Sequence, residues 1–274
     1  MAKRKKAQLW DAVFDRVRVV RRSPDAVYPP PTSEAELDGM ESQLGSRLPH
    51  SYGEFMKRFG PGCIKELVYL LPITPMGKGR AAQTLATRTG ELRTIFGKMK
   101  LGPDLNNEWL SRLVYFAGHQ NGNAEYAWDP TEVTQTTPHE CRFYVLQRLQ
   151  EDRPIAAGGS FAEFLTWLDT DIRSWRDSDP ESREPPGIAF WQTAVRNKKA
   201  PSKRDVKLWL ASNNNTARDL ALSIRDHGQT GAFPILADAL QEAGCTNADM
   251  LDSCRTGDPD IDGVWVLRVL LGDA

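Results

Sequence analysis

Four bulky apolar side chains before Gly60 recur at the spacing of one face of an α-helix. They are Tyr52, Phe55, Met56 and Phe59, at positions i, i+3, i+4 and i+7. Pro49 suits the first position of this helix, and Gly60 suits its end. A helix with so large an apolar face is stable only when that face is buried against other elements. With 40% hydrophobic residues, the 274-residue chain can supply such a core in one large domain, or in one ordinary domain with a smaller companion.

Two further helices are predicted from the residues at their first turns. Ser33 and Glu36 form the Ser-x-x-Glu pattern of a capping box, and the helix that follows ends at Gly45. Ser160 and Glu163 repeat this pattern. The helix after Ser160 has one apolar face, made of Phe161, Phe164, Leu165, Leu168 and Ile172. Each helix is therefore expected to bury one face and to leave the other in solvent.

The chain between these helices predicts strands. Apolar or alternating runs occupy residues 64–73, 113–117, 124–128, 142–146 and 155–156. Asn121-Gly122 suits a hairpin turn, and residues 80–110 form an insertion with a predicted helix around residues 92–99. Helices followed by hairpin-linked strands and a last helix indicate the α+β fold class, a largely antiparallel sheet of about 4–6 strands covered by helices.

Proline-rich and charged segments divide the chain into four predicted parts. Residues 1–31 form a basic N-terminal arm, 32–178 the α+β domain, 179–204 a linker, and 205–274 a small helical C-terminal module. Residues 1–22 carry eight Lys and Arg against Asp11 and Asp15. Such an arm binds nucleic acid in some proteins, but a solvated tail or a short amphipathic helix is the commoner outcome and the one we expect.

The order of these segments resembles the SUKH superfamily (the Smi/Knr-like domain) over about residues 32–170. The resemblance rests on residues 32–37, the pairs Leu44-Gly45 and Leu48-Pro49, the helix from Tyr52 to Gly60, the hairpin of residues 113–129, and residues 160–165. It implies a protein-binding domain and not an enzyme. Many bacterial members of the superfamily resemble immunity proteins that bind and neutralise toxins, so a protein toxin is the partner that the resemblance implies.

The end of the chain resembles a short module appended to many multidomain bacterial proteins. The matching residues are 236–245, Cys254-Arg255 and 263–272. In the usual pattern a His precedes the Cys-Arg pair and a further His and Cys follow it, whereas this chain has Ser253, Asp260 and Val264. Cys245 and Cys254 are also too far apart for the Cys-x(2–4)-Cys spacing of a zinc site. No metal is therefore expected.

The predicted hairpin carries the best candidate for a partner-binding surface. The candidate contact residues are Glu125, Tyr126, Trp128 and Asp129. Aromatic residues anchor interface cores, and carboxylates complement a basic partner. The alternative is that the aromatic residues pack inside the sheet, since one face of the strand must be buried. If Trp128 belongs to the core, we expect the interface on the insertion of residues 80–110.

The sequence offers no motif for catalysis or for a cofactor. His119 and His139 have no local nucleophile, and Gly77-Lys78-Gly79-Arg80 lacks the Lys-Ser/Thr end of a phosphate-binding loop. No apolar run reaches the roughly 18 residues of a membrane-spanning helix, and residues 10–16 are too charged for a signal peptide. We therefore expect a cytoplasmic protein with no membrane partner and no small-molecule substrate.

Three functions compete with toxin binding. One is a nucleic-acid-associated regulator that uses the basic N-terminal arm, whose mark is DNA or RNA binding that weakens with salt. Another is a hydrolase, which a pocket with paired His and carboxylate groups would support. The third is an interaction scaffold in which the C-terminal module holds the partner site. Composition does not decide between them.

We expect the chain, purified without an affinity tag, to contain no stoichiometric zinc, because Cys245 and Cys254 have no complete set of ligands. Elemental analysis measures this directly, and a chelator should leave the thermal unfolding temperature unchanged. One tightly bound zinc ion per chain would contradict the prediction and make the C-terminal module a metal site.

Overall fold

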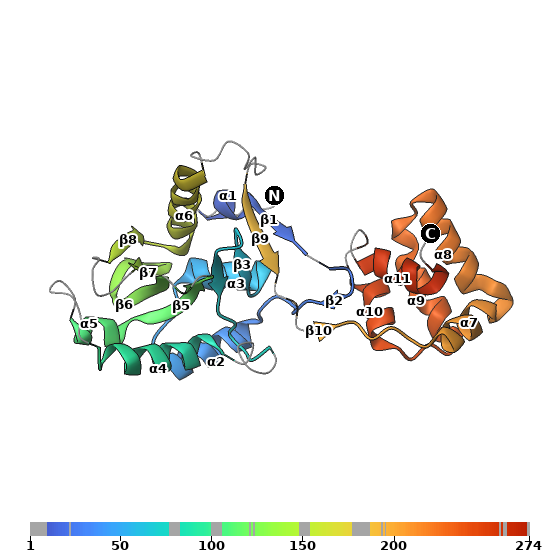
Figure 1. Cartoon of the computed structure of the whole chain (residues 1–274), viewed down its shortest axis with the longest axis horizontal. Coiled ribbons are helices and arrows are strands. Elements are labelled where there is room, and N and C mark those ends of the chain that lie inside the picture. Colours follow the sequence, from blue (N-terminus) through green and yellow to red (C-terminus); the bar gives the residue numbers. More distant parts are fainter. Residues whose placement is uncertain are drawn as a thin grey trace, which may run out of the picture. The chain divides into compact units, whose positions relative to one another are not determined.

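A computed structural model gives the structure of the protein (Figure 1). It describes residues 10–21, 23–76, 83–99, 106–120, 122, 124–147, 154–176, 187–192, 194, 196–257, 259 and 262–272. Residues 3–6, 77–80, 121 and 260 and the side chain of Ile172 lie outside this description. The described residues form two compact units. The first contains residues up to Val20 and from Pro29 to Gln192, and the second contains Arg21–Tyr28 and residues from Ala194 onwards.

The first unit is a sheet with helices on both faces. Its helices are α1 (Asp11–Phe14), α2 (Glu34–Leu44), α3 (His50–Phe59), α4 (Leu85–Phe96), α5 (Asn107–Arg112) and α6 (Phe161–Arg176). Its strands are β1 (Val17–Val20), β3 (Gly62–Ile64), β4 (Val68–Leu70), β5 (Val114–His119), β6 (Ala124–Thr136), β7 (His139–Gln147), β8 (Ile155–Gly158) and β9 (Ile188–Gln192). Among the described residues, eight strands form one sheet in the order β1-β9-β3-β4-β5-β6-β7-β8. Neighbouring strands are antiparallel except β1 and β9, so the predicted α+β class is confirmed, with a larger sheet than expected.

The helices predicted from capping patterns are confirmed. Ser33 and Glu36 form the reciprocal cap of α2, and Gly45 ends this helix in the left-handed conformation at φ 66°. At α6, the Ser160 hydroxyl accepts a hydrogen bond from the Glu163 N–H, while the Glu163 carboxylate accepts one from the Gly159 N–H. Both helices turn apolar side chains to the core.

One face of the sheet is buried by an aromatic core that α3 and α6 share with the strands. Its fully buried rings include Tyr52, Phe55, Phe116, Trp128, Phe143, Phe161, Phe164 and Phe190. The rings of Tyr52 and Phe55 in α3 lie 5.3 and 5.0 Å from the ring of Phe161 in α6. The two helices therefore pack directly on each other as well as on the sheet.

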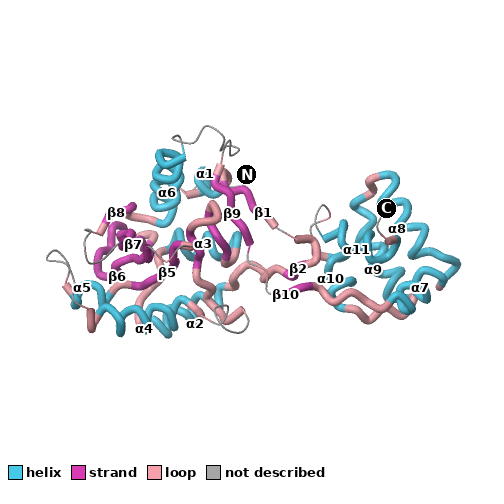
Figure 2. Tube along the Cα trace, viewed as in Figure 1, coloured by secondary structure: helices cyan, strands magenta, loops and turns pink. Residues whose placement is uncertain are grey.

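The other face of the sheet is covered at β5, β6 and β7 by α4 and α5. Leu92, Phe96 and Leu110 of these helices pack against Tyr115 and Leu146 of the strands. Figure 2 shows α4 and α6 on opposite sides of the strands. The described residues of the predicted insertion therefore include the helices α4 and α5, and α4 is longer than the segment predicted around residues 92–99.

Buried polar contacts join the ends of three elements. The Glu140 carboxylate of β7 accepts hydrogen bonds from the Ser51 backbone N–H and hydroxyl at the start of α3, both at 2.8 Å. The Ser51 hydroxyl in turn accepts from the Phe161 N–H at the start of α6, at 2.9 Å. Burial raises the pKa of Glu140. Both helices thereby gain partners for N–H groups that a helix cannot satisfy internally.

The described residues of the predicted arm, residues 1–31, belong to the two compact units and do not form a separate arm. The Phe14 ring of α1 is buried, with its centroid 5.5 Å from that of Phe55. Arg16 binds Asp169 of α6 at 2.6 Å. β1 pairs with β9 and forms one edge of the sheet. The boundary at residue 31 is therefore wrong, because this segment supplies a ring, a charge and a strand to the first unit.

The predicted linker of residues 179–204 contains a strand of the sheet. β9 lies between β1 and β3, and Phe190 at its centre is fully buried. The strand has only five residues and is bounded by Gly187 and by polar residues, so its local sequence does not distinguish it from a linker. The predicted end of the α+β domain at residue 178 is therefore too early.

The second unit is a helical module, as predicted. Its helices are α7 (Lys203–Ala211), α8 (Thr216–His227), α9 (Phe233–Glu242), α10 (Ala248–Arg255) and α11 (Asp262–Leu271), with 3-10 turns at Asn213–Asn215 and Thr230–Ala232. β2 (Ala26–Val27) pairs with β10 (Arg196–Asn197). The Lys198 ammonium lies 2.6 Å from Asp262 Oδ1, 2.7 Å from the Pro24 carbonyl and 4.9 Å from the centre of the Trp265 ring. Residues 21–28 of the predicted arm are thus part of this unit.

We expect Phe14→Ala to lower the free energy of unfolding of the full chain by about 3–5 kcal/mol, because it leaves a cavity in the aromatic core. Denaturant unfolding followed by circular dichroism measures the change. Val19→Ala, at an exposed position of β1, is the control and should cost less than about 1 kcal/mol. Equal, small effects of the two substitutions would show that the N-terminal segment does not belong to the core.

Candidate partner-binding surface

Trp128 and Tyr126, two of the four predicted contact residues, lie inside the aromatic core. The Trp128 ring is fully buried, 5.3 Å from that of Tyr52 and 5.6 Å from that of Phe116. Tyr126 is also buried, and its ring lies 5.7 Å from that of Phe164. The structure therefore corrects the prediction that these side chains form an exposed surface. Residues two positions apart in a strand point to the same face of the sheet, so both rings face the side on which α3 and α6 pack.

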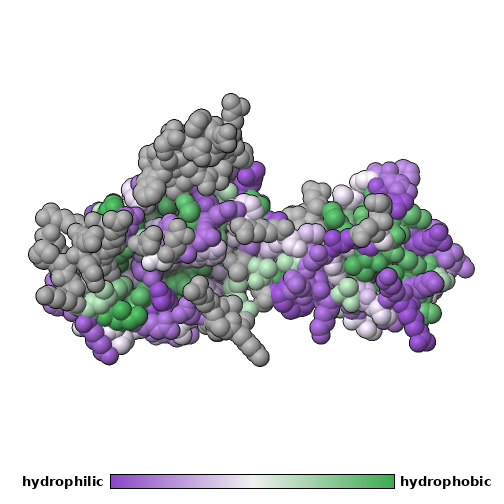
Figure 3. All heavy atoms as spheres, viewed as in Figure 1, coloured by the Kyte–Doolittle hydropathy of each residue, from purple (hydrophilic) through white to green (hydrophobic). Residues whose placement is uncertain are grey.

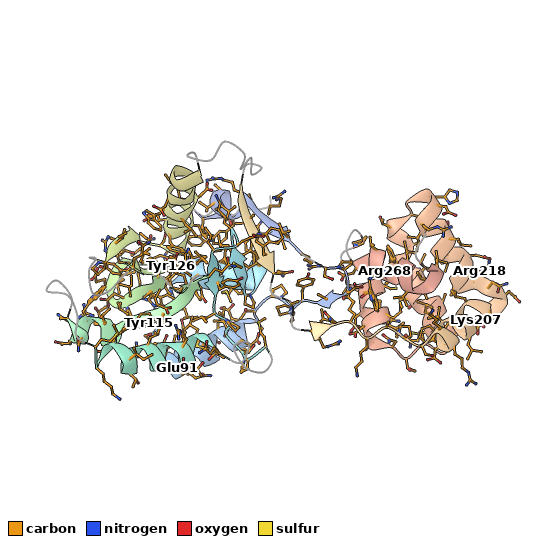
Figure 4. The ribbon with its side chains drawn as sticks, in the orientation of Figure 1. Glu91, Tyr115, Tyr126, Lys207, Arg218 and Arg268 are labelled. Carbon is orange, nitrogen blue, oxygen red and sulfur yellow. The ribbon has the colours of Figure 1, made fainter. Side chains whose placement is uncertain are left out.

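Glu125 points to the opposite face of the sheet and is held there by α4. Its carboxylate forms an ion pair with Arg88 at 2.5 Å. Burial raises the pKa of Glu125, although the charge of Arg88 acts in the other direction. Figure 4 shows the two sides of the sheet through Tyr115, on the side of α4, and Tyr126, on the side of α6. The ion pair between Glu125 of β6 and Arg88 of α4 therefore holds the insertion against the sheet.

Asp129 is buried and positions an exposed arginine. Its carboxylate accepts hydrogen bonds from Arg112 of α5 at 3.0 Å and from the N–H and hydroxyl of Thr131 at 2.9 and 2.7 Å. Burial alone would raise the pKa of Asp129, but these hydrogen bonds outweigh it and lower the pKa. The Asp129 carboxylate is thus charged at neutral pH and fixes the Arg112 guanidinium at the surface, so Asp129 supports a surface without being exposed on it.

Beside Arg112, α5 and β7 bring aromatic and charged side chains together. Trp109 of α5 lies edge-to-face on Tyr144 of β7, with ring centroids 5.1 Å apart. The Tyr144 hydroxyl donates to Glu132 of β6 at 2.8 Å, and Arg142 Nε lies 3.3 Å from the same carboxylate oxygen. We call Trp109, Arg112, Glu132, Arg142 and Tyr144 the α5–β7 face.

The α5–β7 face combines rigid aromatic rings with accessible charges. Trp109 and Tyr144 are half-buried, whereas the side chains of Arg112 and Arg142 are 41% and 44% exposed. Trp, Tyr and Arg are the residues that most often carry binding energy in protein interfaces. Hydrophobic side chains also gather over α4 and α5, where Ile95 is 47% exposed (Figure 3). This surface has the composition of a protein-binding site.

The sequence contained a partial signal for this surface. Arg142 and Tyr144 alternate with the buried residues Cys141, Phe143 and Val145, which places them on the opposite face of β7. Trp109 was missed because α5 has only six residues and lies in an insertion without clear periodicity. Only Trp109 of this face lies within residues 80–110, so the expectation of an interface on that insertion stays a prediction.

The described thiols of Cys141, Cys245 and Cys254 lack the environment of a reactive cysteine. Cys141 Sγ lies 3.5 Å from His139 Nε2, but burial raises the pKa of the Cys141 thiol to about 12 and lowers that of His139. Cys245 and Cys254 are buried, and burial likewise raises the pKa of both thiols. A thiol whose pKa is raised by burial carries almost no thiolate at neutral pH for nucleophilic attack. No group of three potential metal ligands occurs among the described residues.

The model of a known protein family matches half of the chain. Residues 31–167 match the sequence model of the SMI1/KNR4 family (SUKH-1), which is 137 of the 274 residues. The match includes every residue of the α5–β7 face. No curated protein sequence matches the chain. Among the described residues, no helix is long and apolar enough to cross a membrane.

We expect Trp128→Ala to destabilise the chain by about 3–5 kcal/mol, as much as Phe164→Ala, because both rings fill the same core. Denaturant unfolding of the two variants gives the comparison. Trp109→Ala is the matched control, and its half-buried ring should cost clearly less. A Trp128→Ala chain as stable as the unmodified chain would place Trp128 outside the core.

Proposed function

The chain belongs to the SMI1/KNR4 family (SUKH-1), and from this premise we propose that it is an immunity protein that binds a protein toxin and neutralises it. The family is one of immunity-protein-like domains, and its members bind protein partners. In this proposal the chain acts by covering a functional surface of the toxin and performs no chemistry of its own. The buried, high-pKa thiol of Cys141 is consistent with such a passive role.

The observation that carries the proposal is the α5–β7 face. Its two arginines are held by Asp129 and Glu132, so their guanidinium groups lose little freedom when a partner binds. Trp109 and Tyr144 support each other edge-to-face and present a rigid apolar centre. Free N–H donors of Arg112 and Arg142 suit carboxylate or backbone oxygens of a partner. An apolar centre within a charged rim is the usual arrangement of a protein interface.

Selectivity for the toxin would arise from the insertion. Trp109 and Arg112 belong to α5, whereas Arg142 and Tyr144 belong to β7 of the sheet. The Glu125–Arg88 ion pair and the apolar contacts of α4 hold the insertion on the sheet. A change in α5 would therefore alter the partner without altering the aromatic core on the other face.

Removal of residues 1–22 is not a specific test of the alternative function, nucleic-acid binding by the N-terminal arm. Such a truncation also removes Phe14 and β1, which belong to the first unit. Replacing Lys3, Arg4, Lys5 and Lys6 by Ala removes four positive charges and keeps Phe14 and β1 in the chain. Salt-dependent DNA or RNA binding that these four substitutions abolish would favour the regulator.

We expect Trp109→Ala and Arg142→Glu each to weaken binding of the toxin encoded beside this chain's gene by about 2 kcal/mol or more, because both remove parts of the interface centre. Isothermal titration calorimetry with an inactive toxin variant measures the affinity. Co-expression with the active toxin tests neutralisation, which the same substitutions should reduce.

Two controls separate binding from folding. Val133→Ala changes an exposed apolar residue of β6 outside the face and should leave affinity unchanged. The thermal unfolding temperature of Arg142→Glu should stay near that of the unmodified chain. If both the Trp109→Ala and Arg142→Glu variants bind the toxin as tightly as Val133→Ala does, the interface lies elsewhere. If the unmodified chain does not bind the toxin, the proposed immunity function is wrong.

A further inference from the structure

The solvent-facing side of α7, in the second unit, carries cations around an apolar side chain. It presents Lys203, Arg204, Lys207 and Leu208, and the first turn of α8 adds Arg218. The other side of α7 is buried through Val206 and Trp209. A turn of Asn213–Asn215 joins the two helices, and Figure 4 shows Lys207 and Arg218 at the same end of the unit. We call these five exposed side chains the α7 face.

The charges of the α7 face are not used inside the fold. Among the described residues, none of its four cations forms an ion pair, whereas Arg196, Arg255 and Arg268 of the same unit each bind an aspartate. Lys203 and Arg204 also lie in the first turn of α7, where the helix dipole disfavours positive charge. These cations are therefore available to an anionic partner.

Leu208 distinguishes between kinds of anionic partner. It is 57% exposed, follows Lys207 and lies one helical turn after Arg204 and Asp205, so an apolar side chain stands among mainly positive charges. A phosphate backbone offers nothing apolar to cover it, and the face has no exposed aromatic ring to stack on bases. The second unit is also neutral as a whole, since residues 21–28 and 194–274 contain 12 Lys and Arg and 12 Asp and Glu. A nucleic-acid-binding domain is usually strongly basic.

We propose that the α7 face binds an acidic amphipathic protein segment. Its carboxylates would pair with Lys203, Arg204, Lys207 and Arg218, and its apolar side chains would cover Leu208. The contact uses residues of the second unit only and does not depend on toxin binding by the α5–β7 face. The chain would then hold two protein partners, one on each unit.

The test is fluorescence anisotropy with the full-length chain and a labelled synthetic peptide that repeats Glu and Leu at helical spacing. We expect saturable binding that weakens with salt, because the cations contribute to it. Leu208→Ser and Arg204→Glu should each weaken the binding about tenfold or more, as expected for residues near the centre of an interface. A peptide with Ser in place of every Leu should bind the unmodified chain more weakly.

The controls lie in the same unit. Ile235→Ser on α9 changes a side chain that is 59% exposed, and Arg225→Glu changes an arginine already paired with Asp226; neither should alter the affinity. Thermal unfolding should be alike for all four variants. Absence of peptide binding, binding insensitive to Leu208→Ser, or tighter binding of single-stranded or duplex DNA than of the Glu/Leu peptide would each overturn the proposal.

Discussion

The first unit depends on the burial of one aromatic cluster between α3, α6 and the sheet. Phe116, Trp128 and Phe143 come from three adjacent strands, and the rings of Tyr52 and Phe161 close the cluster from the helices. Burial of so many large rings is the main favourable term in the folding of this unit. A slip of one residue in any of these strands would turn its ring to the opposite face, so the cluster also fixes the register of the sheet.

The register that the cluster fixes also decides which residues can meet a partner. With Phe143 turned to the cluster, Arg142 and Tyr144 must lie on the other face of β7. With Trp128 buried, Asp129 lies on the face of Arg142 and reaches Arg112 of α5. The strand residues of the α5–β7 face thus have positions set by the core, which gives the precision that the proposed binding site needs. The same reasoning explains why the core residue Trp128 is a poor contact residue.

Local signals in the sequence predicted the helices well and the ends of the sheet poorly. The caps at Ser33 and Ser160 depend on residues three positions apart, so a short stretch of sequence determines them. β1 and β9 pair with each other across about 170 residues of sequence, as Val17 does with Ile188, and β9 also pairs with β3, so neither strand is specified by its local sequence. The alternation of Tyr126 and Trp128 with Glu125 did favour a buried face for the aromatic residues. What the sequence left open was which side of each strand the helices would cover.

The N-terminal segment shows why boundaries drawn along the chain fail here. Arg16 and Lys65 bind Asp169 within the first unit, so the segment up to β1 is tied to α6 and to the turn after β3. The next eight residues belong to the second unit, where Arg21 lies 3.2 Å from Asp262. The chain then returns to the first unit at Pro29 and enters the second again at Ala194. Neither unit is therefore a continuous stretch of sequence. A truncation that treats residues 1–31 as a dispensable arm would remove an edge strand from one unit and a charged contact from the other, and its loss of function would say nothing about nucleic acid.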